Sequence, residues 1–182
     1  SLMASLSLVK ASNAKEAAAC LAKMESAWNW VIADEQNNIV YQMSGLMPKR
    51  HENWNGFTPM PGWEAKYDWQ GMVESSDLPC LENPKEGFIV TANQDLNHLG
   101  ISSPINMPMG DYRASRIAKL IEQSDQHDVQ SSQKIQFDVY SIQADEFLAI
   151  LLPLLGEQNE QASAFTVLKN WDRQYDLESI AA

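Results

Sequence analysis

The sequence has 182 residues, of which 45% are apolar and 20% charged, and 13 basic against 24 acidic side chains give a net charge of −11. A single domain is the first expectation for this length, and a core can form without disulfides or metal. Because phosphate binding needs clustered Lys and Arg, the acidity excludes a nucleic-acid partner and argues against an anionic membrane surface. The longest apolar run, residues 147–155, contains Pro153 and is about half the roughly 20 residues of a membrane helix, so we expect no membrane partner.

The first residues carry no complete targeting signal. Residues 1–8 lack the basic segment and the cleavage site of a signal peptide, and their small side chains around Met3 indicate an appended leader outside the fold. The two cysteines, Cys20 and Cys80, form no CxxC pair and have no histidine at metal-ligand spacing. This predicts neither a disulfide framework nor a metal site.

A helix and a hairpin are predicted at the start of the second section, residues 9–123. Asn13 followed three residues later by Glu16 has the spacing of a helix N-cap with a reciprocating glutamate. The β-rich runs 27–33 and 39–43 flank the turn-forming residues 34–38, which predicts a β-hairpin.

A Pro/Gly/Trp-rich region follows, from residue 48 to residue 83. Proline and glycine recur there too often for a long helix, and the interleaved tryptophans argue against disorder. We expect an ordered, loop-rich region that packs on itself. The next segment, 87–93, is a short apolar run between turn signals and is predicted to be a central strand buried on both faces.

The rest of the chain has helical periodicity. An amphipathic helix is predicted over 112–123, and the section 124–182 is predicted to be helical over 132–140, 145–155 and 161–171, with Pro153 closing or kinking the second of these. The fold class is therefore α+β, with antiparallel strands, a loop-rich region and a C-terminal helical section.

No catalytic motif stands out from the residues alone. The sequence contains no GxSxG, P-loop, HExxH or GxGxxG pattern. His51, His98 and His127 lie in polar segments and are interpreted as solvated surface residues.

The order of the segments nevertheless resembles one family. The stretch WNWVIADEQNNIVYQMSGLMPKR has an Asn-containing strand, Ala-Asp, an Asn-rich turn, a second strand, Gly and Pro-x-Arg. TPMPGWEAKYDWQGMVESSDLPCLENPKEGFIVTANQ then carries Trp-x-Gly, Leu-Pro, Asn-Pro, Gly-x-Ile and Thr-Ala-Asn. DYRASRIAKLI supplies Tyr-Arg-x-x-Arg-Ile, and IQFDVYSIQADEFLAILLPLL and LKNWDRQYDLESIAA follow. In this order the motifs resemble the penicillin acylase (penicillin amidase) family of N-terminal nucleophile hydrolases.

The resemblance implies an amidohydrolase that cuts N-acyl amide bonds, in β-lactam side chains, acyl-homoserine lactones or related small amides. It also implies a periplasmic precursor that cleaves itself into two chains and uses the freed N-terminal serine of the larger chain, with its own α-amine as base. Ser1 is followed by Leu2 rather than by the asparagine of the family motif, so we expect the nucleophile to be absent from this chain. The chain is then a middle piece of the larger chain, inactive alone, whose partners are the small chain and the remainder of the large chain.

Two residues inherit catalytic roles from the resemblance. Asn93, the asparagine of Thr-Ala-Asn, matches the side chain of the oxyanion hole, and Arg113, in Tyr-Arg-x-x-Arg, matches the arginine that orients active-site groups. Read without the family, Asn93 is a turn residue and Arg113 an exposed helix charge. Arg116, one turn later, is assigned to a structural ion pair.

The resemblance also raises a structural calcium ion, which takes six to eight oxygen ligands. The matching position falls on Pro104 or Asn106 rather than on a carboxylate. We therefore predict no metal ligands and no cofactor in this chain, with a structural calcium left open for the full-length protein.

Two other functions remain open. Trp54, Trp63 and Trp69 could present a stacking surface in a non-catalytic module that binds sugars or a peptide, and the protein could be a family pseudoenzyme. A piece cut from a larger core is also expected to expose apolar surface and to self-associate.

Overall fold

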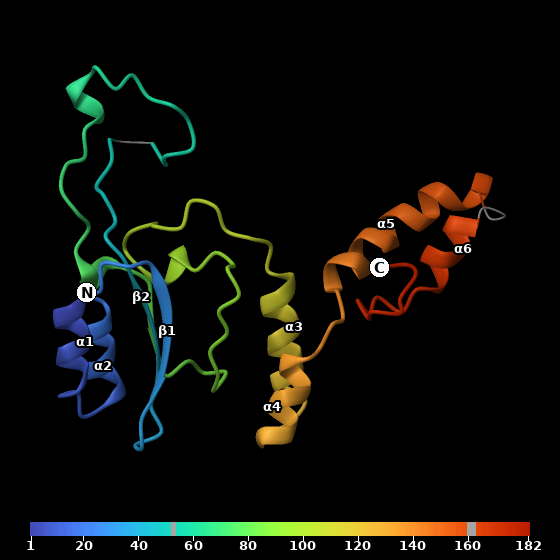
Figure 1. Ribbon diagram of the computed structural model, residues 1–182, viewed down its shortest axis with the longest axis horizontal. Coiled ribbons are helices and arrows are strands. Elements are labelled where there is room, and N and C mark those ends of the chain that lie inside the picture. The colour runs from blue at the N-terminus through green and yellow to red at the C-terminus, as the bar shows by residue number, and fades with distance from the viewer. Residues whose placement is uncertain (52–53, 160–162) are drawn as a thin grey trace. The chain divides into compact units, whose positions relative to one another are not determined.

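The structure, a computed structural model, describes residues 1–51, 54–159 and 163–182 (Figure 1). It divides into two compact units, Ser1–Met109 and Gly110–Ala182, each described here by itself. From the sequence we expected the helical section to start at residue 124. The second unit starts at Gly110 and includes the helix at 112–121, because this helix packs against the later helices.

Two helices open the first unit, α1 (Leu2–Leu8) and α2 (Ala14–Leu21). The predicted N-cap is confirmed, since the Asn13 side chain accepts a hydrogen bond from the Glu16 backbone N–H at 2.9 Å. The Glu16 carboxylate reaches back to the N–H of Ser12, at 2.8 Å, rather than to that of Asn13. Helix α1 packs against α2 and buries Ala4, so residues 2–8 take part in the fold, contrary to the expectation of a leader outside it.

A three-stranded antiparallel sheet follows, with the order β1 (Trp28–Ala33), β2 (Ile39–Ser44) and β3 (Cys80–Glu82). The predicted hairpin is confirmed by the pairing of β1 with β2. The middle strand, β2, carries the two largest fully buried side chains among the described residues, Tyr41 and Val40, and helix α2 packs on the sheet (Figure 1).

Asp34 joins the hairpin turn to the start of α2. Its carboxylate accepts hydrogen bonds from the backbone N–H groups of Ala14 at 3.0 Å and of Gln36 and Asn38 at 2.9 Å, and from the Asn38 amide. These bonds, that from Ala14 first, lower the pKa of Asp34 to about 2, since each stabilises the ionised carboxylate. Asp34 therefore remains an anion and links the turn to the helix terminus.

The predicted strand over 87–93 is wrong. Residues 80–82 pair with β2 in its place, Gly87 closes a turn on Pro84, and residues 88–91 are only half-buried. The Gln94 side chain bonds the C=O of Val90 and the N–H of Ala92, two groups that a sheet ladder would otherwise need. An apolar run between turn signals is a weak predictor of a strand, because it does not show which groups the backbone N–H and C=O groups of the run bond to.

The Pro/Gly/Trp-rich region is irregular and ordered where it is described, as predicted. Lys49 pairs with the backbone of Gly71 and Gln70 at 2.9 and 2.8 Å. The described residues of this unit include the short 3-10 helices η1 (Ala65–Tyr67), η2 (Ser75–Asp77) and η3 (Asn97–Leu99).

The second unit is helical, with α3 (Tyr112–Ile121), α4 (Val129–Gln136), α5 (Ile142–Asn159) and α6 (Ser163–Asn170). Pro153 lies inside α5 and does not close the helix, contrary to one of the two predicted outcomes. The predicted start of the last helix, at Gln161, lies outside the described residues. Of the helices described, none combines the length and the apolar character needed to cross a bilayer.

Helix α5 leaves one apolar face uncovered. Leu148 is buried and α5 packs against α6, but Phe147, Ile150 and Leu154 are 49%, 63% and 77% exposed. These three lie at i, i+3 and i+7, which places them on one side of the helix.

We expect this chain alone to self-associate through that face, because burying the stripe removes apolar surface from water. The double variant Ile150→Lys/Leu154→Lys should sediment as a monomer. The matched control is Val129→Lys, which changes a side chain of similar exposure, 75%, on helix α4 and should leave association unchanged. A wild-type chain that sediments as a monomer at all concentrations would contradict this expectation.

Candidate functional site

Asn93 lies in a loop between β3 and η3, at a backbone φ of +66°. This left-handed conformation is uncommon outside glycine, and asparagine is one of the few side chains that adopt it. The residue is exposed, while Ala92 before it is buried. The loop therefore anchors its backbone at Ala92 and presents the next side chain at the surface.

The Gln94 side chain holds the backbone on the N-terminal side of Asn93. Its Oε1 accepts a hydrogen bond from the Ala92 N–H at 2.6 Å, and its Nε2 donates to the Val90 carbonyl at 2.9 Å. On the other side, the carbonyl of Asn93 itself accepts a hydrogen bond from the N–H of Met109 at 2.8 Å. The backbone around Asn93 is thus fixed before and after the residue.

The following loop is held in a similar way by Asn97. Its Nδ2 donates to the carbonyl of Ile105 at 2.8 Å, and its Oδ1 accepts from the N–H of the same residue at 2.9 Å. Gly100 lies against the Asp77–Pro79 backbone so closely that a Cβ there would come within 2.8 Å of the Pro79 nitrogen. Only glycine allows this approach.

Helix α3 of the second unit carries the two arginines of the Tyr-Arg-x-x-Arg segment. Arg113 is exposed in its first turn. Arg116 makes a bidentate ion pair with Asp138, with Nε at 2.8 Å from Oδ2 and Nη2 at 2.5 Å from Oδ1, which confirms its predicted structural role. Its guanidinium also lies 4.6 Å from the ring centroid of Tyr140. Hydrogen bonding to Arg116 lowers the pKa of Asp138, and the same bonds raise the pKa of Arg116.

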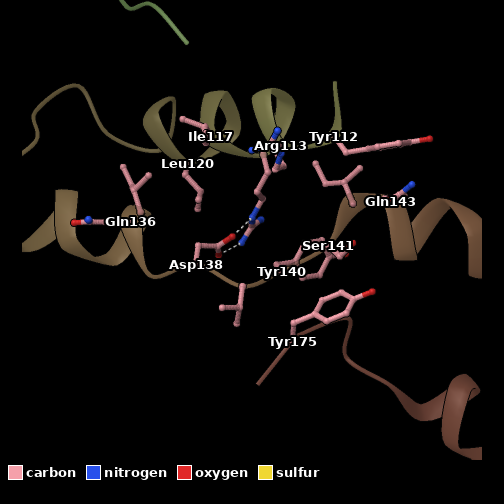
Figure 2. Close-up of a pocket in the computed structure, with 14 residues that line it drawn as sticks. Tyr112, Arg113, Ile117, Leu120, Gln136, Asp138, Tyr140, Ser141, Gln143 and Tyr175 are labelled. Carbon is pink, nitrogen blue, oxygen red and sulfur yellow. Dashed lines mark hydrogen bonds and ion pairs between the residues drawn. The ribbon is translucent and has the colours of Figure 1, made fainter. Parts of the chain in front are cut away.

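These arginines border a groove of about 540 Å³ within the second unit. Figure 2 shows Tyr112, Arg113 and Leu120 of α3 on one side of it and Asp138 and Tyr175 on the other. The walls are largely apolar and aromatic, and the Arg116–Asp138 pair crosses the groove. Asn93 belongs to the first unit and Arg113 to the second, so the two predicted site residues come from different units.

A second groove, of about 520 Å³, lies within the first unit beside Arg50. The Arg50 guanidinium lies 5.6 Å from the ring centroid of Trp54, and its Nη1 is 3.4 Å from the sulfur of Met47. Ser102 and Asn106 complete part of the wall.

The histidines follow the sequence interpretation in two of three cases. His98 and His127 are exposed, whereas His51 is half-buried with its ring 5.4 Å from that of Tyr67.

The tryptophans of the proposed stacking surface do not form one cluster. Trp63 and Trp69 are exposed, and within the described parts of the chain no ring contact joins Trp54, Trp63 and Trp69 to one another.

Neither Ser1 nor the calcium position shows a built site. The Ser1 amine and hydroxyl both lie 3.3 Å from the Glu25 carboxylate at an exposed position. Pro104 offers no side-chain ligand, and Asn106 donates to the Asn55 carbonyl at 2.8 Å. Residues 1–51, 54–159 and 163–182 contain no group of three or more His, Cys, Asp or Glu side chains placed to hold a metal ion. The side chains at the expected position do not supply the carboxylate oxygens that a calcium ion prefers.

Sequence reasoning missed Gln94 and Asp138. Gln94 follows Asn93 directly, so the sequence shows that the two are neighbours. It does not show that the Gln94 side chain bonds the backbone at both Ala92 and Val90. Asp138 is 22 residues from Arg116, and no local spacing joins the two.

The comparisons with known proteins agree with the motif order. A family model described as penicillin amidase matches residues 1–182. The acyl-homoserine lactone acylase QuiP of Pseudomonas aeruginosa is 36% identical over 115 residues, which are 63% of this chain and 13% of that protein. The penicillin G acylase of Escherichia coli is 33% identical over 115 residues, 63% of this chain and 12% of that protein.

The fold agrees as well. The thermostable penicillin G acylase of Alcaligenes faecalis superposes with a TM-score of 0.72 at 24% identity, covering 96% of this chain and 32% of that one. The α+β fold is thus that of this part of penicillin G acylase. Because the family model matches its whole length, the chain belongs to the penicillin amidase family.

Proposed function

We propose that the protein containing this chain hydrolyses N-acyl amide bonds, with Asn93 as a hydrogen-bond donor to the reacting carbonyl oxygen. The observation that carries the proposal is the presentation of Asn93, an exposed amide at φ +66° on a backbone fixed on both sides, at the Thr-Ala-Asn position of a penicillin amidase family member. The nucleophile is proposed to be an N-terminal serine from outside residues 1–182, because the chain covers only 13% of the length of QuiP.

In this mechanism the serine Oγ forms a bond to the amide carbon, and its proton passes to the serine α-amine. An α-amine has a pKa of about 7.7–8.0 and is therefore partly neutral near neutral pH. The electron pair of the C=O bond moves to oxygen, and the N–H of the Asn93 side chain donates to that oxyanion. Collapse expels the amine, which takes the proton from the α-amine, and water then releases the acid from the acyl-serine in the same way.

The proposed substrates are small N-acyl amides. Relatives named penicillin G acylase and acyl-homoserine lactone acylase support this class, which covers β-lactam side chains, acyl-homoserine lactones and related amides. Arg113 is proposed to orient groups in this site. The resemblance further supports a periplasmic location and association with the rest of the same precursor.

The test is hydrolysis by the full-length protein. Phenylacetyl 4-nitroanilide and an N-acyl-homoserine lactone should each be assayed for release of the free amine, and we expect turnover of at least one. A correctly processed, folded protein that releases no amine from any N-acyl amide would contradict the amidase and favour the pseudoenzyme or the binding module.

The isolated chain should release no amine, because the proposed nucleophile is not among its residues. The control is Ser1→Ala, which should change nothing. Activity of the isolated chain that Ser1→Ala abolishes would show that Ser1 is the nucleophile instead.

A further inference from the structure

We infer that Gln94 is a positioning residue for Asn93, and that its side-chain amide sets the direction in which Asn93 donates to the oxyanion. This inference rests on the proposed function, since it has a consequence for catalysis only if Asn93 is the donor. Gln94 itself is not expected to touch the substrate, because both ends of its amide are bonded to the protein backbone.

The two hydrogen bonds act on the backbone that leads into Asn93. Oε1 of Gln94 fixes the Ala92 N–H at 2.6 Å and Nε2 fixes the Val90 carbonyl at 2.9 Å, so one planar amide spans residues 90–92. Ala92 is buried, so a shift toward solvent would expose its methyl group. The two peptides that flank Thr91 therefore have a fixed orientation, and this restricts the direction in which the backbone enters Asn93 and its Cα–Cβ bond points.

This control is needed because Asn93 adopts a conformation that the backbone does not favour by itself. A non-glycine residue at φ +66° lies in the sparsely populated left-handed region, and extended conformations compete with it. The N–H of Met109 holds the carbonyl of Asn93, but that bond does not act on residues 90–92, which lead into Asn93. Gln94 supplies the restraint there.

The two hydrogen bonds from the Gln94 side chain, to Ala92 and Val90, form what we call the Gln94 clamp, and catalysis should depend on this clamp for a geometric reason. A donor in an oxyanion hole acts only when its N–H points to the place where the negative charge develops. A displacement of about 1 Å can cost about 10²-fold in rate. Loss of the Gln94 contacts should therefore weaken stabilisation of the transition state while leaving substrate binding nearly unchanged.

The experiment is a double-mutant cycle in the full-length protein, with Gln94→Met and Asn93→Gly. Methionine keeps the length of the Gln94 side chain and removes both hydrogen bonds, and glycine adopts the left-handed conformation without strain. We expect Gln94→Met to lower kcat by about 10- to 100-fold with KM within about twofold. In the Asn93→Gly background the same substitution should change kcat by less than about twofold, because the group through which Gln94 acts is gone.

Asn97→Ala is the matched control. Asn97 bonds an N–H and a C=O of the backbone as Gln94 does, at 2.9 and 2.8 Å, but it fixes Ile105 in the next loop. It should lower the thermal unfolding temperature about as much as Gln94→Met, change kcat by less than about threefold, and act equally in the Asn93→Gly background. Gln94→Glu gives a second test if Gln94→Met fails to fold, since its carboxylate can accept from Ala92 but cannot donate to Val90.

The outcomes distinguish a failure of the positioning role of Gln94 from a failure of the proposed donor role of Asn93. If Asn93→Gly lowers kcat while Gln94→Met and Gln94→Glu do not, or if their effects persist fully beside Asn93→Gly, the positioning role is overturned and the oxyanion donor stands. If Asn93→Gly leaves kcat unchanged, the assignment of Asn93 is wrong and the role of Gln94 is overturned with it.

Discussion

Replacing Asn93 with alanine in the full-length protein should lower kcat by about 10²–10³ and leave folding intact. The residue is exposed and the loop backbone is held by the bonds of Gln94 and of the Met109 N–H, so we expect the fold to survive the substitution. The donor acts mainly on the transition state, so KM should stay within a few-fold of the wild-type value. The measurements are thermal unfolding and steady-state hydrolysis of whichever N-acyl amide the full-length wild-type protein turns over.

Asn37→Ala is the control for this variant. Asn37 is also an exposed asparagine of the first unit, and its φ of +64° nearly equals that of Asn93, but it lies in the hairpin turn. Both substitutions place alanine in the left-handed region and carry a similar backbone cost. If the two variants lose kcat equally, the loss reflects destabilisation, and Asn93 is no oxyanion donor.

The elements that the sequence predicted correctly are those with local signals. The N-cap of α2 needs only Asn13 and Glu16, which are three residues apart, and the hairpin needs only two β-rich runs around a turn. The helical periodicity of α3 was equally local. Each of these signals lies within one turn or one hairpin, so no information about distant parts of the chain was required.

The failures concern competition between distant segments. Residues 87–93 have the composition of a strand, but residues 80–82 pair with β2, and Gln94 takes up backbone groups of the longer run. Residues 2–8 look featureless until α2 offers Ala4 a surface to pack on. Such outcomes depend on which of two segments pairs with a given strand or packs on a given helix. The local sequence pattern of one segment does not contain that information.

The candidate site shows the same division. Asn93 was found through the order of motifs, and composition alone would have left it a turn residue. The structure adds what the sequence could not supply: the left-handed backbone, the Gln94 clamp and the separate unit of Arg113. The Arg116–Asp138 pair was half predicted, since the charge on α3 was assigned to an ion pair but its partner was not identified.

That pair should be the largest single electrostatic contribution to the stability of the second unit. The side chains of Arg116 and Asp138 are only 24% and 17% exposed, and they meet through two hydrogen bonds. Removing one partner of a fully buried pair costs about 3–5 kcal/mol, whereas exposed pairs contribute about 0–1 kcal/mol. We therefore expect Arg116→Met to lower the free energy of unfolding by about 2 kcal/mol at pH 7, intermediate between these limits. The measurement is urea unfolding of the chain, with Lys119→Met, which changes an exposed cation on the same helix, as the control.

The pH dependence of this loss follows from the sign of the pKa shift. The bonds to Arg116 hold the pKa of Asp138 below its usual range, so the stability that they provide is present above the pKa of the unfolded chain, about 3.9. It is lost as the pH falls through the lower pKa of the folded state, where the carboxylate is protonated. The difference in unfolding free energy between wild type and Arg116→Met should therefore be constant from about pH 7 to 5 and shrink steadily below about pH 4. A difference that stays constant down to pH 2 would mean that the side chain of Arg116 stabilises the unit by packing on Tyr140, at 4.6 Å from its ring centroid, and not through Asp138.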